Sequence, residues 1–172
     1  RRGDQCADCP PLRRIGLRVE VFDTDCEGRM ILADALTWTA RQKPELIIDA
    51  ATLTGACCVA LGTPYSGLFT SDDALAYDLI KAGRDSLDDV WCLPVGAEYA
   101  KLMKTPAADI ANQATVRDGG ASSAAAFLSV FAEDVRWAHL DIAATANTSG
   151  RDRHSTGRPV PMLMRFLLKK MR

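Results

Sequence analysis

Two periods of apolar positions recur along the chain, and each predicts a different kind of element. Residues 18–22 (Arg-Val-Glu-Val-Phe) alternate at period two, which predicts a strand. In residues 29–42 the apolar positions recur at helical spacing, and we expect this helix to end at Lys43 because Pro44 disfavours the α region for the residue before it. The positions at helical spacing are Ile31, Leu32, Ala35, Leu36 and Thr39.

Strands and helices continue to alternate after Pro44. Short apolar runs predict strands at 46–49, 66–70, 90–93 and 137–143. Helices are predicted at 72–82 after an N-cap at Ser71, at 97–103, at 121–132 and from Pro159 onward. This order predicts an α/β fold whose mixed, mostly parallel sheet is flanked by helices. Residues 1–17 are expected to be irregular, and residues 18–172 to form the domain.

Composition narrows the class of protein. With 172 residues, of which 48% are apolar and 25% charged, the chain matches a soluble globular domain, and disordered or fibrous classes are excluded. The formal net charge of −1 gives no electrostatic reason to expect a nucleic acid or an anionic membrane as partner. No apolar run approaches the roughly 20 residues that span a bilayer, and no secretory signal is visible.

The six cysteines favour a reduced, cytoplasmic setting. Cys6 and Cys9 have a metal-like spacing, but a structural zinc site usually needs a second pair of ligands, and the two histidines lie far away and apart. Cys57 and Cys58 stand in an apolar run of small residues, where cysteine behaves as a small buried hydrophobe. A zinc knuckle is therefore the less favoured interpretation.

An acidic cluster follows the first predicted strand. Asp23, Asp25 and Glu27 stand two residues apart, with Arg29 next in the same series. On extended backbone such residues point to the same side, so we expect the three carboxylates to converge beside the arginine. Carboxylates held together repel one another unless a cation compensates them, and oxygen ligands suit a divalent metal. From the residues alone, the alternative is a solvated acidic turn.

Four blocks of the sequence, in the right order, resemble the leucyl aminopeptidase family, which includes peptidase B. Residues 23–36 (Asp-Thr-Asp-Cys-Glu-Gly-Arg-Met-Ile-Leu-Ala-Asp-Ala-Leu) are similar to the family pattern N-T-D-A-E-G-R followed by an aliphatic run and A-D-A-L. Residues 48–56, 137–143 and 155–160 are similar to three later family blocks. The resemblance implies that this chain is the carboxyl-terminal part of the family's catalytic domain.

The resemblance also implies an activity. The family implies a cytosolic, homo-hexameric metalloprotease, a hydrolase that releases N-terminal, leucine-like residues from peptide substrates with two divalent metal ions, Zn²⁺ or Mn²⁺. By this resemblance Asp25 and Glu27 are metal ligands, and Arg29 helps to stabilise the developing gem-diolate, in part through a bound bicarbonate. This chemistry is coherent, because two metals activate a bridging water and a fixed cation opposes the negative charge that develops.

The substrate contacts come from the later blocks. By resemblance the backbone of Leu53 contacts the substrate, Thr52 and Gly55 line the first specificity pocket, and Ala143 and Ala146 match further pocket positions. From the residues alone, 52–55 is a strand-to-helix turn. We expect His139 to be a structural histidine, because its neighbours on the predicted strand are apolar.

The chain departs from the family in three ways. The family's metal-binding lysine, two metal-binding aspartates and substrate-polarising lysine, in G-K-G and M-K-x-D-M type segments, have no counterpart, and residues 1–20 contain no lysine. Asp23 replaces the family asparagine. Cys26 replaces alanine and, by alternation, is expected to point away from Asp25 and Glu27.

Two further interpretations remain beside the aminopeptidase. In one, the chain is a catalytically incomplete fragment or remnant that acts only by association. In the other, it is a nucleotide-binding α/β domain, which is weaker because no glycine-rich phosphate-binding motif follows a predicted strand.

Overall fold

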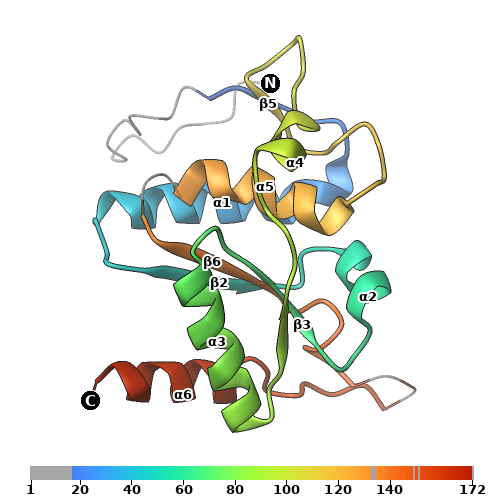
Figure 1. Cartoon of the computed structure of the whole chain (residues 1–172). Coiled ribbons are helices and arrows are strands. Elements are labelled where there is room, and N and C mark those ends of the chain that lie inside the picture. Colours follow the sequence, from blue (N-terminus) through green and yellow to red (C-terminus); the bar gives the residue numbers. More distant parts are fainter. Residues whose placement is uncertain (1–16, 133–134, 149, 151, 172) are drawn as a thin grey trace.

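A four-stranded sheet lies between two layers of helices in the computed structural model (Figure 1). The structure describes residues 17–132, 135–148, 150 and 152–171. Cys6, Cys9 and the rest of the segment expected to be irregular lie outside the described residues, except for Leu17. The strands of the sheet, in spatial order, are β2 (Ile47–Ala51), β6 (Trp137–Asp141), β3 (Ser66–Phe69) and β4 (Val90–Cys92).

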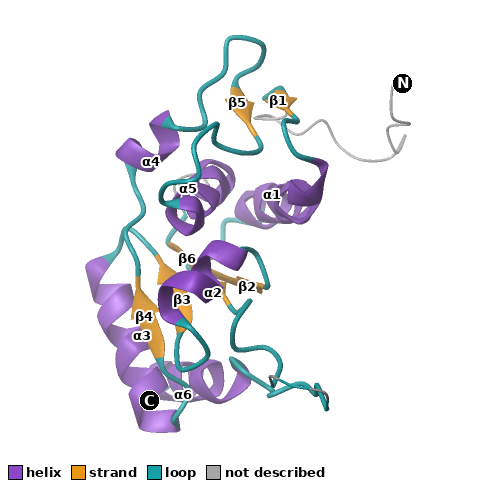
Figure 2. Cartoon of the chain, turned by 90° about the vertical axis from the view of Figure 1, so that its right-hand side faces the viewer, coloured by secondary structure: helices purple, strands orange, loops and turns teal. Residues whose placement is uncertain are grey.

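The sheet is mixed, because one of its three strand pairs is antiparallel. β2 runs parallel to β6 and β3 runs parallel to β4, whereas β3 and β6 are antiparallel. The expected mixed, mostly parallel sheet is confirmed. A second, two-stranded sheet pairs β1 (Val19–Glu20) in parallel with β5 (Ile110–Ala111), and Figure 2 shows it beyond the helices, apart from the main sheet.

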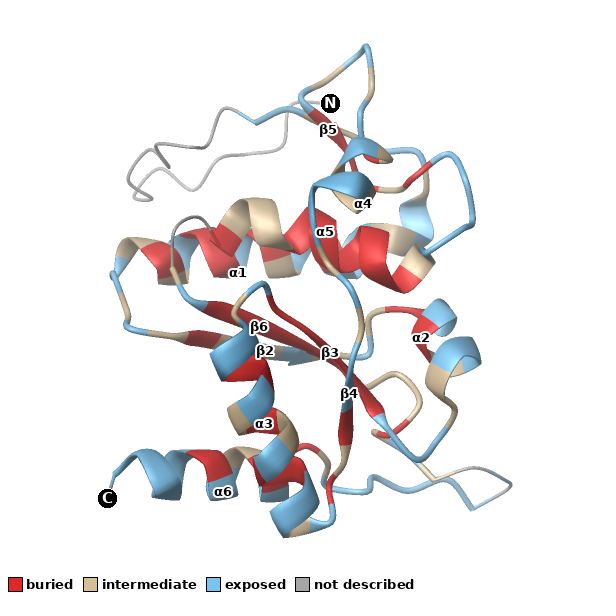
Figure 3. Cartoon of the chain, in the orientation of Figure 1, coloured by how far each residue is buried: buried red, intermediate tan, exposed pale blue. Residues whose placement is uncertain are grey.

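Each face of the main sheet is covered by a pair of helices. On one face, α1 (Glu27–Arg41) packs against α5 (Gly120–Ala132), and on the other, α3 (Asp73–Ser86) packs against α6 (Val160–Lys170). Figure 3 shows α5 buried along most of its length, and its small side chains allow α1 to approach closely. No helix among the described residues is long and apolar enough to cross a bilayer.

The structure corrects three predicted helix boundaries. The first helix begins at Glu27 rather than at residue 29. In addition, residues 55–61 form a short helix, α2 (Gly55–Leu61), that the periodicity of the sequence does not predict. Asp72, rather than Ser71, caps α3 by accepting a hydrogen bond from the Leu75 amide. α3 also continues past Gly83, because this glycine serves close packing rather than termination: a Cβ there would lie 2.8 Å from the Asp88 carbonyl oxygen. The remaining helix is α4 (Ala97–Lys101).

One buried carboxylate joins the two loops that leave the sheet beside each other. Asp141, at the end of β6, is 1% exposed and pairs in register with Ala51 at the end of β2. Its Oδ1 accepts hydrogen bonds from the amides of Leu53 (3.2 Å) and Ala143 (3.1 Å). Its Oδ2 accepts one from the Thr54 hydroxyl (2.7 Å), which also caps α2. Asp141 therefore fixes the path of the chain after both strands.

Apolar surface is left open next to β2. Among the described residues, β2 has a strand partner on one side only. On the outer face of α1, Ile31 and Trp38 stand two helical turns apart and are 70% and 62% exposed. Exposed apolar side chains and an open strand edge are each typical of surface that another part of a protein, or another chain, covers.

We predict that Asp141→Asn destabilises the natural, full-length protein by about 1–3 kcal/mol, because the Thr54 hydroxyl then faces an amide donor where it had a carboxylate acceptor. The free energy of unfolding in urea measures this change. Asp73→Asn, in the exposed first turn of α3, is the control and should alter stability by less than about 0.5 kcal/mol. Equal stability of the Asp141 variant and wild type would contradict the role assigned to this carboxylate.

We predict that this 172-residue chain, expressed by itself, is poorly soluble or partly molten, binds an apolar dye and unfolds with low cooperativity. Dye fluorescence together with circular dichroism during urea unfolding measures both properties. Replacing the exposed apolar residues, in Ile31→Lys/Trp38→Glu, should reduce dye binding. A sharp, cooperative transition without dye binding would refute this expectation.

Candidate active site

The acidic cluster folds as a helical turn rather than an extended segment. The Asp23 side chain accepts a hydrogen bond from the Asp25 amide (2.9 Å) and caps a 3-10 turn at Thr24–Cys26, which continues into α1. The expected convergence of three carboxylates by period two is therefore wrong, because helical backbone sends residues two apart in different directions. Asp23 serves as a cap, whereas Asp25 and Glu27 remain free to line a pocket.

A pocket of about 240 Å³, the carboxylate pocket, forms between the start of α1 and the loop after β2. It brings together Asp25, Glu27 and Arg29 from one side and Thr52 and Leu53 from the other. Five of the eight residues expected in the site thus meet in one place. The pocket is also lined by Cys26, Gly28 and Ala51.

A second pocket, of about 370 Å³, adjoins the first and shares four lining residues with it, Asp25, Cys26, Arg29 and Leu53. Gly55 lines this second pocket, and a Cβ built on it would meet nothing within 4 Å. Its other residues are Thr54, Ala56, Gln113, Ala114, Val116, Arg117, Gly120 and Ser123.

Ala143 and Ala146 do not join these two pockets. Ala143 lines a separate hollow together with Cys58 and Gly62. After β6 the chain turns back on itself, since the Ala146 amide donates to the Ile142 carbonyl, and this turn carries both alanines away from Asp25. Ala143 is linked to the carboxylate pocket only through Asp141, which also binds the Leu53 amide.

Arg29 carries a buried positive charge into the site. The residue is 7% exposed, and its Nη1 donates to the Asn112 carbonyl oxygen at 2.7 Å. Among the described residues Arg29 forms no ion pair. Burial lowers the pKa of its guanidinium, while the nearby Cys26, Asp23 and Asp141 oppose that shift. A buried cation with a neutral partner is well placed to attract an anion.

Cys26 lies in the site rather than away from it. The expectation that Cys26 points away from Asp25 and Glu27 is wrong, because residues 24–26 are helical rather than extended. Cys26 lines both pockets. Burial raises the pKa of its thiol, opposed by Arg29 and reinforced by Asp23, Asp25 and Glu27. The thiol therefore stays protonated near neutral pH.

Two residues that sequence reasoning missed hold the site together. Asp141 binds the loop that carries Leu53 and Thr54, and the fully buried Asn112 binds both the Arg29 guanidinium and the segment before Asp25. Each is a polar residue at the end of a strand, which is the available signal in the sequence. Their partners lie more than 80 residues away, so the sequence does not identify them.

His139 is buried in the core, as expected of a structural histidine, although its Nε2 has no hydrogen-bond partner among the described residues. It is fully buried, its Nδ1 lies 2.5 Å from Asp49 Oδ1, and its ring stacks on Phe69 and Trp137. It lines neither pocket at the start of α1.

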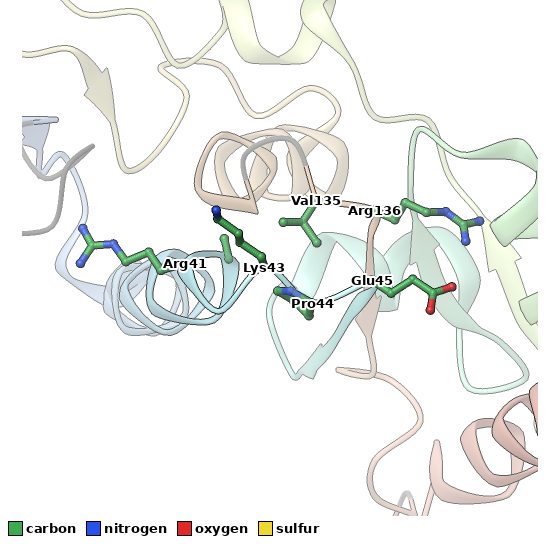
Figure 4. A pocket seen from close by; sticks show the side chains of 7 residues that line it. Arg41, Lys43, Pro44, Glu45, Val135 and Arg136 are labelled. Atoms are coloured by element: carbon green, nitrogen blue, oxygen red, sulfur yellow. The ribbon is translucent and has the colours of Figure 1, made fainter.

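A larger pocket, of about 560 Å³, lies at the far end of α1, roughly 20 Å from the carboxylates for a helix of this length. Figure 4 shows Arg41, Lys43 and Arg136 pointing in different directions there rather than toward one point. Arg136 is already bound to Asp72. Size alone therefore does not make this pocket the site.

Asp25 and Glu27 have the donor chemistry of a metal site but are too few to complete one. Carboxylate oxygens suit divalent cations, and both side chains line the same pocket. The described residues contain no group of three or more potential ligands that could hold an ion. The two carboxylates therefore fit as part of a ligand set whose other members lie elsewhere.

Comparisons with known proteins identify a family. Residues 13–164 match the model of the cytosol aminopeptidase family, catalytic domain. The chain is 54% identical over 156 residues to a probable cytosol aminopeptidase of Acinetobacter baylyi, covering 91% of this chain and 32% of that protein. It is 54% identical over 155 residues to one of Dechloromonas aromatica, covering 90% and 31%.

A solved structure shares the fold. A mutant of tomato leucine aminopeptidase superposes with a TM-score of 0.84 at 40% identity, covering 89% of this chain and 30% of that one. The chain spans about a third of the length of the relatives it matches. Because the family model covers most of the chain, we conclude that this chain belongs to the cytosol aminopeptidase family.

Proposed function

We propose that this chain is the carboxyl-terminal part of the catalytic domain of a metal-dependent aminopeptidase, which releases N-terminal, leucine-like residues from peptides. One observation carries the proposal: Asp25, Glu27, Arg29, Thr52 and Leu53 line a single pocket, and they lie in the segments that resemble the family. The names of the relatives support peptide substrates and a cytoplasmic location. The resemblance adds a homo-hexamer to the proposal.

In this proposal Asp25 and Glu27 hold part of a pair of divalent ions, Zn²⁺ or Mn²⁺. The metals, when bound, supply Lewis-acid activation of water and of the scissile carbonyl. The start of α1 favours the two carboxylates, because the positive end of the helix dipole lies there. The remaining ligands would come from protein segments outside the described residues.

Arg29 would act on the negative charge that develops at the reacting carbonyl. A guanidinium that is already buried and fixed by the Asn112 carbonyl needs little reorganisation when that charge appears. The same position would hold a small anion such as bicarbonate, since the arginine has no ion-pair partner among the described residues.

The loop after β2 would bind the peptide through its backbone. The Leu53 amide already donates to Asp141, which leaves the Leu53 carbonyl oxygen to accept a hydrogen bond from the substrate. Thr52 and Gly55 flank this position, and the open space in front of Gly55 leaves room for a leucine-like side chain. Ala143 and Ala146 remain proposed specificity positions that would act from the neighbouring turn.

The incomplete ligand set favours a second candidate for the isolated chain. With only Asp25 and Glu27 as carboxylate donors in the pocket, a chain of this length on its own would be a catalytically incomplete fragment that acts by association. This candidate and the aminopeptidase differ in whether the chain turns over substrate without the rest of a full-length protein.

In the full-length protein, Glu27→Ala should lower metal-dependent hydrolysis of leucine anilide by roughly a hundredfold or more, because a first ligand of the metal is lost. Steady-state rates and bound metal per chain measure the effect. Asp73→Ala is the matched control, an exposed carboxylate in the first turn of α3 on the other face of the sheet. Near wild-type turnover in the Glu27 variant would show that the ligand assignment is wrong.

The 172-residue chain alone should not hydrolyse leucine anilide when Mn²⁺ or Zn²⁺ is supplied, because two carboxylates and water hold a metal pair weakly. The assay is run on protein whose secondary structure has been verified by circular dichroism. Turnover that a chelator abolishes would mean that these few ligands suffice, and it would exclude the incomplete-fragment candidate.

A further inference from the structure

Asn112 uses all four of its polar groups within the site. Its backbone amide donates to the Glu20 carbonyl (2.9 Å), and its backbone carbonyl accepts from Arg29 Nη1 (2.7 Å). Its side-chain Oδ1 accepts from the amides of Phe22 (2.9 Å) and Asp23 (3.4 Å), and its Nδ2 donates to the Asp23 carbonyl (2.7 Å). Asn112 thus contacts both the segment just before the acidic turn and Arg29, which follows the turn.

These contacts fix the two ends of the turn that carries the carboxylates. Asp25 and Glu27 lie between Asp23, which the Asn112 side chain holds, and Arg29, which the Asn112 backbone holds. A shift of Asn112 would therefore change the position of the guanidinium relative to both carboxylates. Asn112 itself has little freedom, because it is fully buried and continues the pairing of β5 with β1.

The chemistry of this position calls for an amide. The side chain must accept from one peptide group and donate to another, and among small side chains only asparagine offers both functions in one plane. Aspartate would set an oxygen against the Asp23 carbonyl and add a negative charge beside Arg29. Serine is too short to reach both Phe22 and Asp23 from the same backbone position.

We infer that Asn112 is the positioning residue that fixes the Arg29 guanidinium relative to the carboxylate turn, and so sets how strongly the site binds negative charge at the reacting carbonyl. The inference rests on the proposed function, because it concerns the same site. Asn112 acts through Arg29 and the turn and does not itself touch the substrate.

The test compares a tetrahedral anion with a substrate. The inhibition constant of the aminophosphonic acid analogue of leucine, and kcat and KM for leucine anilide, are measured for the full-length wild type and for Asn112→Asp. We expect the variant to bind the analogue roughly tenfold or more weakly and to lose kcat by a similar factor, while KM changes by less than about threefold. The inhibition constant does not depend on how many molecules fold, so loss of stability alone would leave it unchanged.

Two further variants separate positioning from general damage. Thr70→Val removes a buried hydroxyl that donates to the Trp137 carbonyl (2.7 Å) at the opposite end of β6 from Asp141, and it should leave the inhibition constant unchanged. Asn112→Ser tests the same inference if the aspartate variant fails to fold. In an Arg29→Met background, Asn112→Ser should weaken analogue binding less than it does in the wild type, because the part of its effect that acts through Arg29 is gone.

The outcomes distinguish the inference from the function on which it rests. A wild type that neither hydrolyses leucine anilide nor binds the analogue would overturn the proposed function, and this inference with it. An active wild type whose Asn112 variants bind the analogue as tightly as wild type would overturn the positioning role alone. Weakening of the same size in the Thr70 control, or by Asn112→Ser in the Arg29→Met background, would also refute it.

Discussion

The register between β2 and β6 is the constraint on which the rest of the structure depends. Five residue pairs in parallel align Ile47 with Trp137 and Ala51 with Asp141, so both strands leave the sheet at the same edge. A shift of one residue would turn the alternating side chains to the opposite faces and separate the two helical layers from their core residues. It would also remove Asp141 from the Leu53 amide. The pocket therefore has its position because the strands pair in this register.

Local periodicity predicts the fold of this chain better than it predicts the geometry of the site. Apolar positions at period two or at helical spacing are set by residues that are close in the sequence. The strands of the main sheet and most of the helices that cover it therefore agree with their predicted ranges. The site depends on the backbone at one turn, where Asp23 forms a cap and the chain becomes helical before the carboxylates are reached. Asp25, Glu27 and Arg29 line one pocket, although the period-two argument for the convergence of the three carboxylates was wrong. The residues that hold them, Asn112 and Asp141, act across more than 80 positions.

The electrostatics of the site combine opposite charges in a small space. Arg29 is buried with a carbonyl oxygen as partner, and such a cation is costly unless negative charge lies near it. Asp23 and Asp141 supply part of that charge without forming an ion pair, while Asp25 and Glu27 face the pocket. The same hollow thus presents oxygen donors to a cation and a guanidinium to an anion. Cys26, protonated and partly buried between them, adds volume rather than charge.

The separation of β2 and β6 in the sequence has a consequence for biosynthesis. When Ala51 is added to the growing chain, the residue with which it pairs, Asp141, is still 90 positions from being made. Arg29 lacks its carbonyl partner until Asn112 is made, and the loop of Leu53 lacks its acceptor until Asp141 is made, so these contacts cannot yet set the distance between the start of α1 and the loop after β2. Contacts of such long range form late and slowly in folding. The nascent chain can therefore form α1 well before it acquires its pocket, which waits first for Asn112 and then for Asp141.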